Sequence, residues 1–432
     1  MGSWRGALAV YGSRRMLAVL FMGFSSGLPL ALTFGTLSYW LAEAGVSRTE
    51  IGLFVLVGFS YNYKFVWSPF IDRLPIPFLT RRLGRRRSWA VLIQLLLMAA
   101  IFALGQTDPA VDLARTALLA VLVAFLSASQ DIVIDAYRIE LLRPEEQGAG
   151  AAATQWGYRI GMLASGAGAF DAAAYGGWHF AYRVMAGLMA VGLVTVLLTR
   201  EPAVPAAAPV VGGGPLFDQA AAWARQAIVA PFGDFMRRRG WVAIIAFIVL
   251  YKCGEALAGT MANPLYQGMG FTKLEVGNIG KIVSFAASLS GVALGGALVA
   301  RLGLYGALML GGVLQMLSNL LYIALLLAGH NDAMLALSIF GENFTGGLAS
   351  AAFVAYLSGL CSLAFTATQY ALFSSIAAVP VRVLSAPAGW LVDRLDWIPF
   401  FLVATAACVP SLILLLWLRR SLLDEAPSAV SS

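Results

Sequence analysis

Two carboxylates and an arginine recur at helical spacing within one strongly apolar stretch of the chain. Asp131, Asp135 and Arg138 are four and then three residues apart, so an α-helix places all three on one face. Carboxylates in a polar cavity inside a membrane can take up and release protons. We therefore predict that Asp131 and Asp135 take part in proton coupling. For Asp135 and Arg138, a charge pair that locks helix ends together is the alternative role.

A second group of ionisable residues lies in the other half of the chain. Lys252 and Glu255 are three residues apart and are expected to share a helical face and to pair, while Glu342 is an isolated carboxylate. We predict that Glu255 and Glu342 also take part in proton coupling. Lys64, Arg159 and Lys252 are predicted to bind an anionic substrate. Lys64 has the alternative role of a side chain that reaches the membrane interface.

Composition indicates which elements must position these groups. Of the 432 residues, 60% are hydrophobic and 12% are charged, and the mean hydropathy is +0.80. A water-soluble fold could not bury so much hydrocarbon, so lipid must surround this chain. We predict twelve transmembrane helices, each about long enough to cross a bilayer. The predicted spans are 16–41, 50–70, 88–105, 113–138, 148–172, 178–199, 241–268, 273–300, 304–328, 333–360, 365–391 and 397–418.

The distribution of the basic residues that give the net charge of +7 indicates the orientation of these spans. With the N-terminus in the cytoplasm, inner loops carry more than three times as many basic residues as outer loops. We therefore predict that both termini are cytoplasmic. The same distribution leaves no basic surface that would suggest a nucleic-acid partner.

The chain divides around one long connection that is less apolar than the rest. We predict an N-terminal six-helix bundle (1–199), a cytoplasmic linker (200–240), a C-terminal six-helix bundle (241–420) and a cytoplasmic tail (421–432). The linker begins with a flexible segment rich in Pro, Ala and Gly. Its second part, Leu216–Phe235, has a helical period and is predicted to lie on the inner leaflet.

A repeated motif indicates that the two bundles are duplicates. Residues 45–52 read GVSRTEIG between spans one and two, and residues 270–277 read GFTKLEVG between spans seven and eight. Parallel duplication of six spans is typical of the major facilitator fold, so we predict an all-α membrane protein of that fold. Glu50 and Glu275 complete capping boxes and are interpreted as structural rather than proton-carrying.

Several classes of chemistry are disfavoured. The three cysteines are far apart and the two histidines, His179 and His330, fall in outer loops, so we expect no metal site, no cofactor and no catalytic residue. No phosphate-binding loop is present, which disfavours direct use of ATP. The pattern GFSSG at 23–27 lies inside a predicted span and indicates close helix packing of the GxxxG kind. The chain is not predicted to be an enzyme.

The loop after span two carries a candidate gate. Asp72 and Arg73 end the span, and the run LGRRR at 83–87 precedes the next one. An acid at a helix end followed by basic residues resembles the inner-gate motif of the major facilitator superfamily. We predict that Asp72, Arg73 and Arg85, with Arg138, form charge pairs that close the inner side, whereas the alternative is basic anchoring at the membrane surface.

Eight short strings are distributed across essentially the whole chain: 23–33 (GFSSGLPLALT), 64–73 (KFVWSPFIDR), 127–136 (SASQDIVIDA), 148–152 (GAGAA), 157–162 (GYRIGM), 250–252 (LYK), 342–343 (EN) and 367–372 (ATQYAL). Together they resemble the AmpG family of muropeptide permeases. One departure is Gln147, where the family pattern suggests arginine. Another is Arg382, whose position is shifted relative to the arginine of the family pattern.

The resemblance implies proton-driven import of N-acetylglucosaminyl-1,6-anhydro-N-acetylmuramyl peptides from periplasm to cytoplasm, across a bacterial inner membrane. Tyr158 is then expected to stack on sugar faces, and Gln130, Asn343 and Gln369 to join the substrate site. The expected partners are this anhydromuropeptide, protons and the lipid bilayer, and the chain is expected to be monomeric. Two alternatives stay open: uptake of another anionic solute, such as a siderophore or acetyl-CoA, and a non-transporting assembly or delivery factor.

Overall fold

The computed structural model describes residues 10–203 and 222–424, and in these ranges all regular structure is helical. Predictions for the first part of the linker and for the tail beyond residue 424 fall outside the described residues. The α-helices are α2 (Arg14–Thr33), α3 (Gly35–Glu43), α4 (Arg48–Leu53), α5 (Phe59–Tyr63), α6 (Ser68–Arg73), α7 (Leu79–Leu83), α8 (Arg85–Leu104), α9 (Leu113–Leu141), α10 (Gln147–Leu163), α11 (Ala169–Leu188), α12 (Ala190–Leu198), α14 (Ala230–Met236), α15 (Trp241–Leu250), α16 (Cys253–Gly268), α17 (Lys273–Ala328), α18 (Asp332–Gly359), α19 (Thr366–Ala377), α20 (Val379–Leu395), α21 (Trp397–Ala406) and α22 (Val409–Asp424). Shorter 3-10 and π segments are Val10–Gly12, Phe54–Gly58, Lys64–Val66, Pro144–Glu146, Ala164–Gly168 and Arg225–Val229.

Seven helical stretches among the described residues are long and apolar enough to cross a membrane. Two of them contain 55 residues each, which at about 1.5 Å per residue far exceeds a hydrocarbon core of about 30 Å. A glycine with positive φ turns the chain in each, Gly177 (76°) and Gly303 (72°), so each holds two crossings. The seven stretches, two of which cross twice, account for nine crossings. Helix α18 and the runs α4–α6 and α19–α20 add three. The described residues therefore contain the predicted twelve crossings, and the fold prediction is confirmed.

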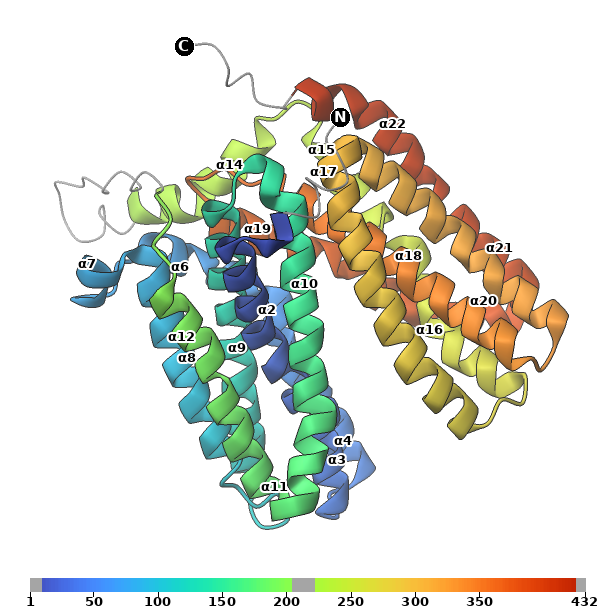
Figure 1. Cartoon of the computed structure of the whole chain (residues 1–432), viewed down its shortest axis with the longest axis horizontal. Helices are drawn as coiled ribbons and strands as arrows, with labels where there is room; N and C mark the ends of the chain where they lie inside the picture. The colour runs from blue at the N-terminus through green and yellow to red at the C-terminus, as the bar shows by residue number, and fades with distance from the viewer. Residues whose placement is uncertain (1–9, 204–221, 425–432) are drawn as a thin grey trace. The chain divides into compact units, whose positions relative to one another are not determined.

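The chain folds into two compact units, each of which is described by itself. The N-terminal unit consists of Tyr11–Asp234 together with Leu360–Ser375, and the C-terminal unit consists mainly of Phe235–Gly359 and the residues from Ile376 onward. In the N-terminal unit α2, α8, α9, α10 and α11 are the long helices (Figure 1). Residues 360–375 pack with the N-terminal unit although they follow α18 in the chain. The sequence-based division at 199 and 240 stays a prediction.

Glycines allow two pairs of helices to approach backbone to backbone. A Cβ atom on Gly157 of α10 would lie 1.9 Å from the carbonyl oxygen of Leu20 in α2, and one on Gly27 would lie 2.0 Å from that of Tyr158. In the C-terminal unit, a Cβ on Gly291 of α17 would lie 2.0 Å from the carbonyl oxygen of Phe344 in α18. The GxxxG interpretation is therefore confirmed, since only glycine fits at these crossings.

The two predicted capping boxes are also confirmed. The Ser47 hydroxyl accepts the amide of Glu50, and the Glu50 carboxylate accepts the amide of Ser47 at 3.1 Å. Thr272 and Glu275 form the same pair of bonds at the start of α17. These glutamates therefore satisfy helix-terminal amides, as the structural interpretation predicted.

The described part of the predicted interfacial helix packs on the end of span two. Helical residues begin at 222, and the ring of Trp223 lies 5.1 Å from that of Phe70 in α6. The guanidinium of Arg73 donates to the carbonyl oxygen of Gln226 at 3.4 Å. These contacts give the helix a fixed protein neighbour, while its position on the inner leaflet stays a prediction.

Replacing Gly157 by valine should disrupt the contact between α2 and α10. Overpacking a closely packed site costs about 1–3 kcal/mol or more, and here the obstacle is backbone that cannot rotate away. We expect a clearly lower melting temperature in detergent for G157V, measured by fluorescence-detected size-exclusion chromatography. The matched control is G187V, since Gly187 is exposed on α11 and a Cβ there meets no atom within 4 Å. Equal melting temperatures for the two variants would contradict the packing argument.

Candidate functional site

Asp131 lies at the centre of a polar group inside the N-terminal unit. It is half-buried on α9, and the hydroxyl of Ser26 on α2 donates to its carboxylate at 2.6 Å. The buried ammonium of Lys64 acts electrostatically on both Asp131 and Asp135. Asp135 in turn pairs with Arg138 at 3.7 Å. Two predicted proton carriers and one predicted anion-binding residue are thus brought together.

A proline explains how α2 and α9 are held in register at this site. Pro29 has no amide hydrogen, so the carbonyl oxygen of Ser25, four residues earlier, has no helical donor. The side-chain amide of Gln130, next to Asp131, donates to that oxygen at 2.8 Å. Gln130 is completely buried in this contact, so the structure gives it a role in packing. Its predicted role in substrate binding stays a prediction.

One lysine in each unit lies at a break between helices. Lys64 begins a short 3-10 segment between α5 and α6, and Lys252 lies between α15 and α16. Broken helices mark the substrate sites of many transporters because they present backbone and side chains to a cavity. Lys252 pairs with Glu255 at 2.7 Å, as predicted, and lies 5.6 Å from the ring centre of Phe353.

Glu342 borders a cavity inside the C-terminal unit. The Tyr322 hydroxyl donates to its carboxylate, and Glu255 lies within electrostatic range. The cavity has a volume of about 400 Å³ and is lined by residues of α16, α17 and α18, among them Glu342, Asn343 and Tyr266. The side-chain amide of Asn343 donates to the carbonyl oxygen of Ile339 at 2.9 Å, which fixes the side chain within this lining. Three predicted residues of this unit, Glu255, Glu342 and Asn343, thus lie near one another.

The predicted gate is centred on an arginine that the sequence analysis did not select. Arg86, only 1% exposed, donates to Asp72 at 2.7 Å and to both oxygens of Glu140 at 3.0 and 3.1 Å. Arg85, the predicted partner, instead donates to the carbonyl oxygen of Asp72 at 2.8 Å and lies 3.7 Å from Glu140. Arg73 lies 5.0 Å from the ring centre of Phe365.

The second oxygen of Asp72 binds the first turn of α19. It accepts the amide of Thr368 at 3.0 Å and the Thr368 hydroxyl at 2.9 Å. Helix-terminal amides have no partner within the helix and carry a positive partial charge, so a carboxylate stabilises them. We call Asp72, Arg86, Glu140 and Thr368 the clamp.

Further contacts hold residues 360–375 in the N-terminal unit. Gln369 accepts the amide of Ser362 at 2.7 Å and donates to Asp234 and to the carbonyl oxygen of Pro231. The guanidinium of Arg138 lies 5.5 Å from the ring centre of Tyr370. Gln369 is buried in these bonds, so the structure gives it a role in packing, and its predicted substrate contact stays a prediction.

The remaining predicted substrate residues lie on α10. Tyr158 and Arg159 are both half-buried, and each has electrostatic or polar contacts with other residues. Sequence reasoning also missed Ser26, Tyr322, Arg86 and Glu140. The polar residues Ser25, Ser26, Thr33 and Thr36 in span one could have pointed to Ser26, whereas no sequence pattern points to Tyr322.

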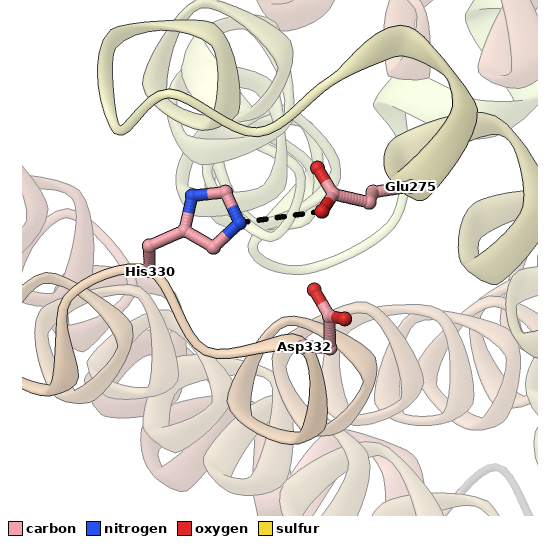
Figure 2. Close-up of side chains that lie close together, drawn as sticks. All are labelled: Glu275, His330 and Asp332. Atoms are coloured by element: carbon pink, nitrogen blue, oxygen red, sulfur yellow. Dashed lines mark hydrogen bonds and ion pairs between the residues drawn. The ribbon is translucent and has the colours of Figure 1, made fainter.

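A separate group of potential metal ligands lies in the C-terminal unit, where α17 begins and where the loop from α17 to α18 passes. Figure 2 shows Glu275, His330 and Asp332 facing one another, with one hydrogen bond at 3.4 Å between His330 and Glu275. The other oxygen of Glu275 already accepts the amide and hydroxyl of Thr272 at 2.6 and 2.8 Å. Helix capping and one histidine contact therefore account for Glu275 without a metal ion.

Solved structures of the same fold include well-defined transporters. The fucose:proton symporter of Escherichia coli aligns with a TM-score of 0.69 at 11% identity, over 94% of this chain and 98% of that one. The human organic anion transporter MFSD10 aligns with a TM-score of 0.62 at 14% identity, over 96% and 100% of the two chains. These likenesses show the fold, which is that of an all-helical, multi-span membrane protein of the major facilitator type.

Sequence relatives give the family. The chain is 41% identical over 417 residues to the anhydromuropeptide permease of Escherichia coli K12, covering 96% of this chain and 82% of the relative. It is 32% identical to a protein of Rickettsia felis named putative transporter AmpG 4, over 95% and 98% of the two chains. A family model described as acetyl-coenzyme A transporter 1 matches residues 15–170. This chain belongs to the AmpG family of anhydromuropeptide permeases.

Replacing Arg86 by alanine should destabilise the N-terminal unit. Removing one partner of a buried ion pair costs about 3–5 kcal/mol, because Asp72 and Glu140 would stay buried without their counter-charge. We expect a melting temperature several degrees lower in detergent. The matched control is R81A, since Arg81 is exposed on α7. An unchanged melting temperature for R86A would show that Arg85 or water can replace Arg86.

Proposed function

We propose that this chain is a proton-coupled importer of anhydromuropeptides. The observation that carries the proposal is the half-buried Asp131, which accepts one hydroxyl hydrogen bond and lies within electrostatic range of the buried Lys64. A half-buried carboxylate can exchange its proton with water and still interact electrostatically with a charged neighbour. Uptake would run from periplasm to cytoplasm across a bacterial inner membrane, with both termini cytoplasmic and the chain monomeric.

Coupling follows from the electrostatics of Asp131 and Lys64. With Asp131 ionised, Lys64 has a counter-charge and is poorly available to an anion. Protonation of Asp131 removes one of the two carboxylate charges that act on Lys64, so its ammonium then attracts an anionic substrate more strongly. Proton and anion therefore each favour binding of the other, which is the thermodynamic requirement for symport.

The C-terminal unit contains a second carboxylate–lysine pair, Glu255 and Lys252, to which the same argument applies. Protonation of Glu255 would release Lys252, whose side chain is 15% exposed, to bind an anion. Glu342 and Asn343 border a cavity that can take up hydroxyl-rich groups by hydrogen bonding. We assign Lys64, Arg159 and Lys252 to the anionic groups of the substrate and Tyr158 to its sugar faces.

Gating is proposed to use the clamp. Residues 360–375 connect α18 to α20 of the C-terminal unit, yet their contacts are with Asp72, Asp234 and Arg138 of the N-terminal unit. A change of conformation that moves α18 and α20 would pull on this segment. The clamp would then stabilise one conformation of the transport cycle and open in another.

The substrate assignment is supported by the name of the Escherichia coli relative, an anhydromuropeptide permease. A second candidate, acetyl-coenzyme A, is supported by the family model that matches residues 15–170. Both are anionic, so the same basic residues could serve either one.

Replacing Asp131 by asparagine should abolish proton-driven accumulation, because the amide keeps the size of the side chain but cannot take up a proton. We expect D131N to reach the wild-type membrane level while its accumulation falls to the value seen with a protonophore. The measurement is uptake of labelled anhydromuropeptide into cells that lack their own permease. The control is D108N, the same change in an exposed outer-loop residue. Normal accumulation by D131N would rule out Asp131 as the coupling residue.

Uptake into proteoliposomes with an imposed pH gradient should separate the two substrates. We expect labelled anhydromuropeptide to accumulate and labelled acetyl-coenzyme A to stay near the level of protein-free vesicles. Accumulation of acetyl-coenzyme A alone would replace the proposed substrate and keep the proton-coupled mechanism. If neither accumulates in a preparation that is folded by size-exclusion chromatography, the non-transporting alternative gains support.

A further inference from the structure

The N-terminal unit contains a larger cavity that is separate from the Asp131 group. Its volume is about 930 Å³, and it lies where α2 begins and where α9 and α12 end. None of its lining residues belongs to the proposed substrate site. The lining includes Arg14, Arg15, Leu17, Phe21, Leu198 and Arg200.

Basic side chains supply the free charge of this cavity. The side chains of Arg14 and Arg200 are exposed and make no ion pair with the described residues. Arg15 has one long contact, 3.5 Å to Glu146, and stays 45% exposed.

The acidic residues of the lining are already engaged. Glu140 binds Arg86 in the clamp, and Glu201 accepts the amides of Arg86 and Arg87 at 2.7 and 3.0 Å, which caps α8. The surplus charge that faces the cavity is therefore positive.

One side of the cavity is apolar and open. Leu17 and Phe21, one turn apart on α2, are 49% and 44% exposed, and Leu198 at the end of α12 is 81% exposed. In a membrane, hydrocarbon chains rather than water cover side chains of this kind. The cavity thus combines the cationic side chains of Arg14, Arg15 and Arg200 with an apolar surface suited to acyl chains.

We propose that this cavity binds an anionic phospholipid, with its phosphate between Arg14, Arg15 and Arg200 and its acyl chains against Leu17, Phe21 and Leu198. Basic pockets between membrane helices on the cytoplasmic side are suited to such headgroups, and the positive-inside distribution predicts that side here. A free phosphate would use the arginines alone and would leave the apolar wall uncovered. The apolar wall therefore favours a lipid.

The position of the cavity also connects it to the clamp. Glu140 contributes to the lining and holds Arg86, which binds Asp72. A bound phosphate would draw Arg14 and Arg200 towards itself and would add negative charge near Glu140. A lipid bound here can therefore change the strength of the ion pair between Glu140 and Arg86 in the clamp.

The experiment is native mass spectrometry of the purified full-length protein titrated with phosphatidylglycerol or with zwitterionic phosphatidylethanolamine. We expect the wild type to retain phosphatidylglycerol preferentially. We expect R14Q/R200Q to bind it about tenfold or more weakly, because each substitution removes one cationic side chain from the phosphate. The matched control is R81Q/R82Q, which removes the same charge from exposed residues of α7 outside the cavity. That control should stay within about twofold of the wild type, since its arginines lie outside the proposed headgroup site.

Three outcomes would overturn the proposal. Equally weakened binding in R14Q/R200Q and in the control would indicate general charge attraction, and equal retention of the two lipids would exclude headgroup selectivity. Displacement of phosphatidylglycerol by millimolar inorganic phosphate would point to a free-anion site. If the double variant is not monodisperse, the single variants R14Q and R200Q replace it, each with part of the weakening expected. Failure of this test would leave the proposed transport function untouched, because the cavity shares no residue with the substrate site and the variants leave the clamp residue Glu140 unchanged.

Discussion

A charge inside a bilayer must have a partner, and this constraint arranges the interior of both units. Asp131 and Lys64 act on each other within the N-terminal unit, and Lys252 and Glu255 pair within the C-terminal unit. Each lysine lies at a helix break, where an unwound backbone admits polar surroundings. The charged residues proposed to bind the substrate are also the ones that neutralise each other when no substrate is present. In the proposed mechanism, competition between the carboxylate and the substrate for the lysine would couple proton and substrate binding.

The scaffold around the charged groups is rigid because glycine and proline set its geometry. Gly157 and Gly27 let α2 and α10 touch along their backbones, which fixes the position of α2. Pro29 then removes a helical hydrogen bond from Ser25, and Gln130 of α9 supplies the replacement. Asp131 follows Gln130 directly, so the same contact that ties the helices also positions the carboxylate near Ser26. The position of Asp131 is thus determined by the packing of α2 against α9 and α10.

Local patterns in the sequence predicted the features that depend on neighbouring residues. The spans, the capping boxes, the GxxxG crossings and the pairing of Lys252 with Glu255 all follow from hydropathy or helical spacing. The clamp could not be predicted at residue level, because the positive φ of Gly84 (90°) resets the helical phase and turns Arg86 rather than Arg85 inward. The packing of residues 360–375 with the N-terminal unit is a long-range contact without any local signal. The role of Gln130 was accessible in principle, since a proline always leaves one carbonyl group without its donor.

In the proposed gating, the free energies of the two contacts of Asp72 decide which of them opens. Breaking the buried pair with Arg86 costs about 3–5 kcal/mol, because it leaves charges without partners in a dry environment. Releasing the first turn of α19 gives up two buried hydrogen bonds to the carboxylate, but it frees only neutral donors and leaves Asp72 paired with Arg86. The pair of Asp72 with Arg86 should therefore persist while the bonds to Thr368 form and break. In the proposed gating, an aspartate shared between a lasting and an exchangeable partner would act as a reversible latch, because Arg86 keeps the carboxylate oriented for α19 to return.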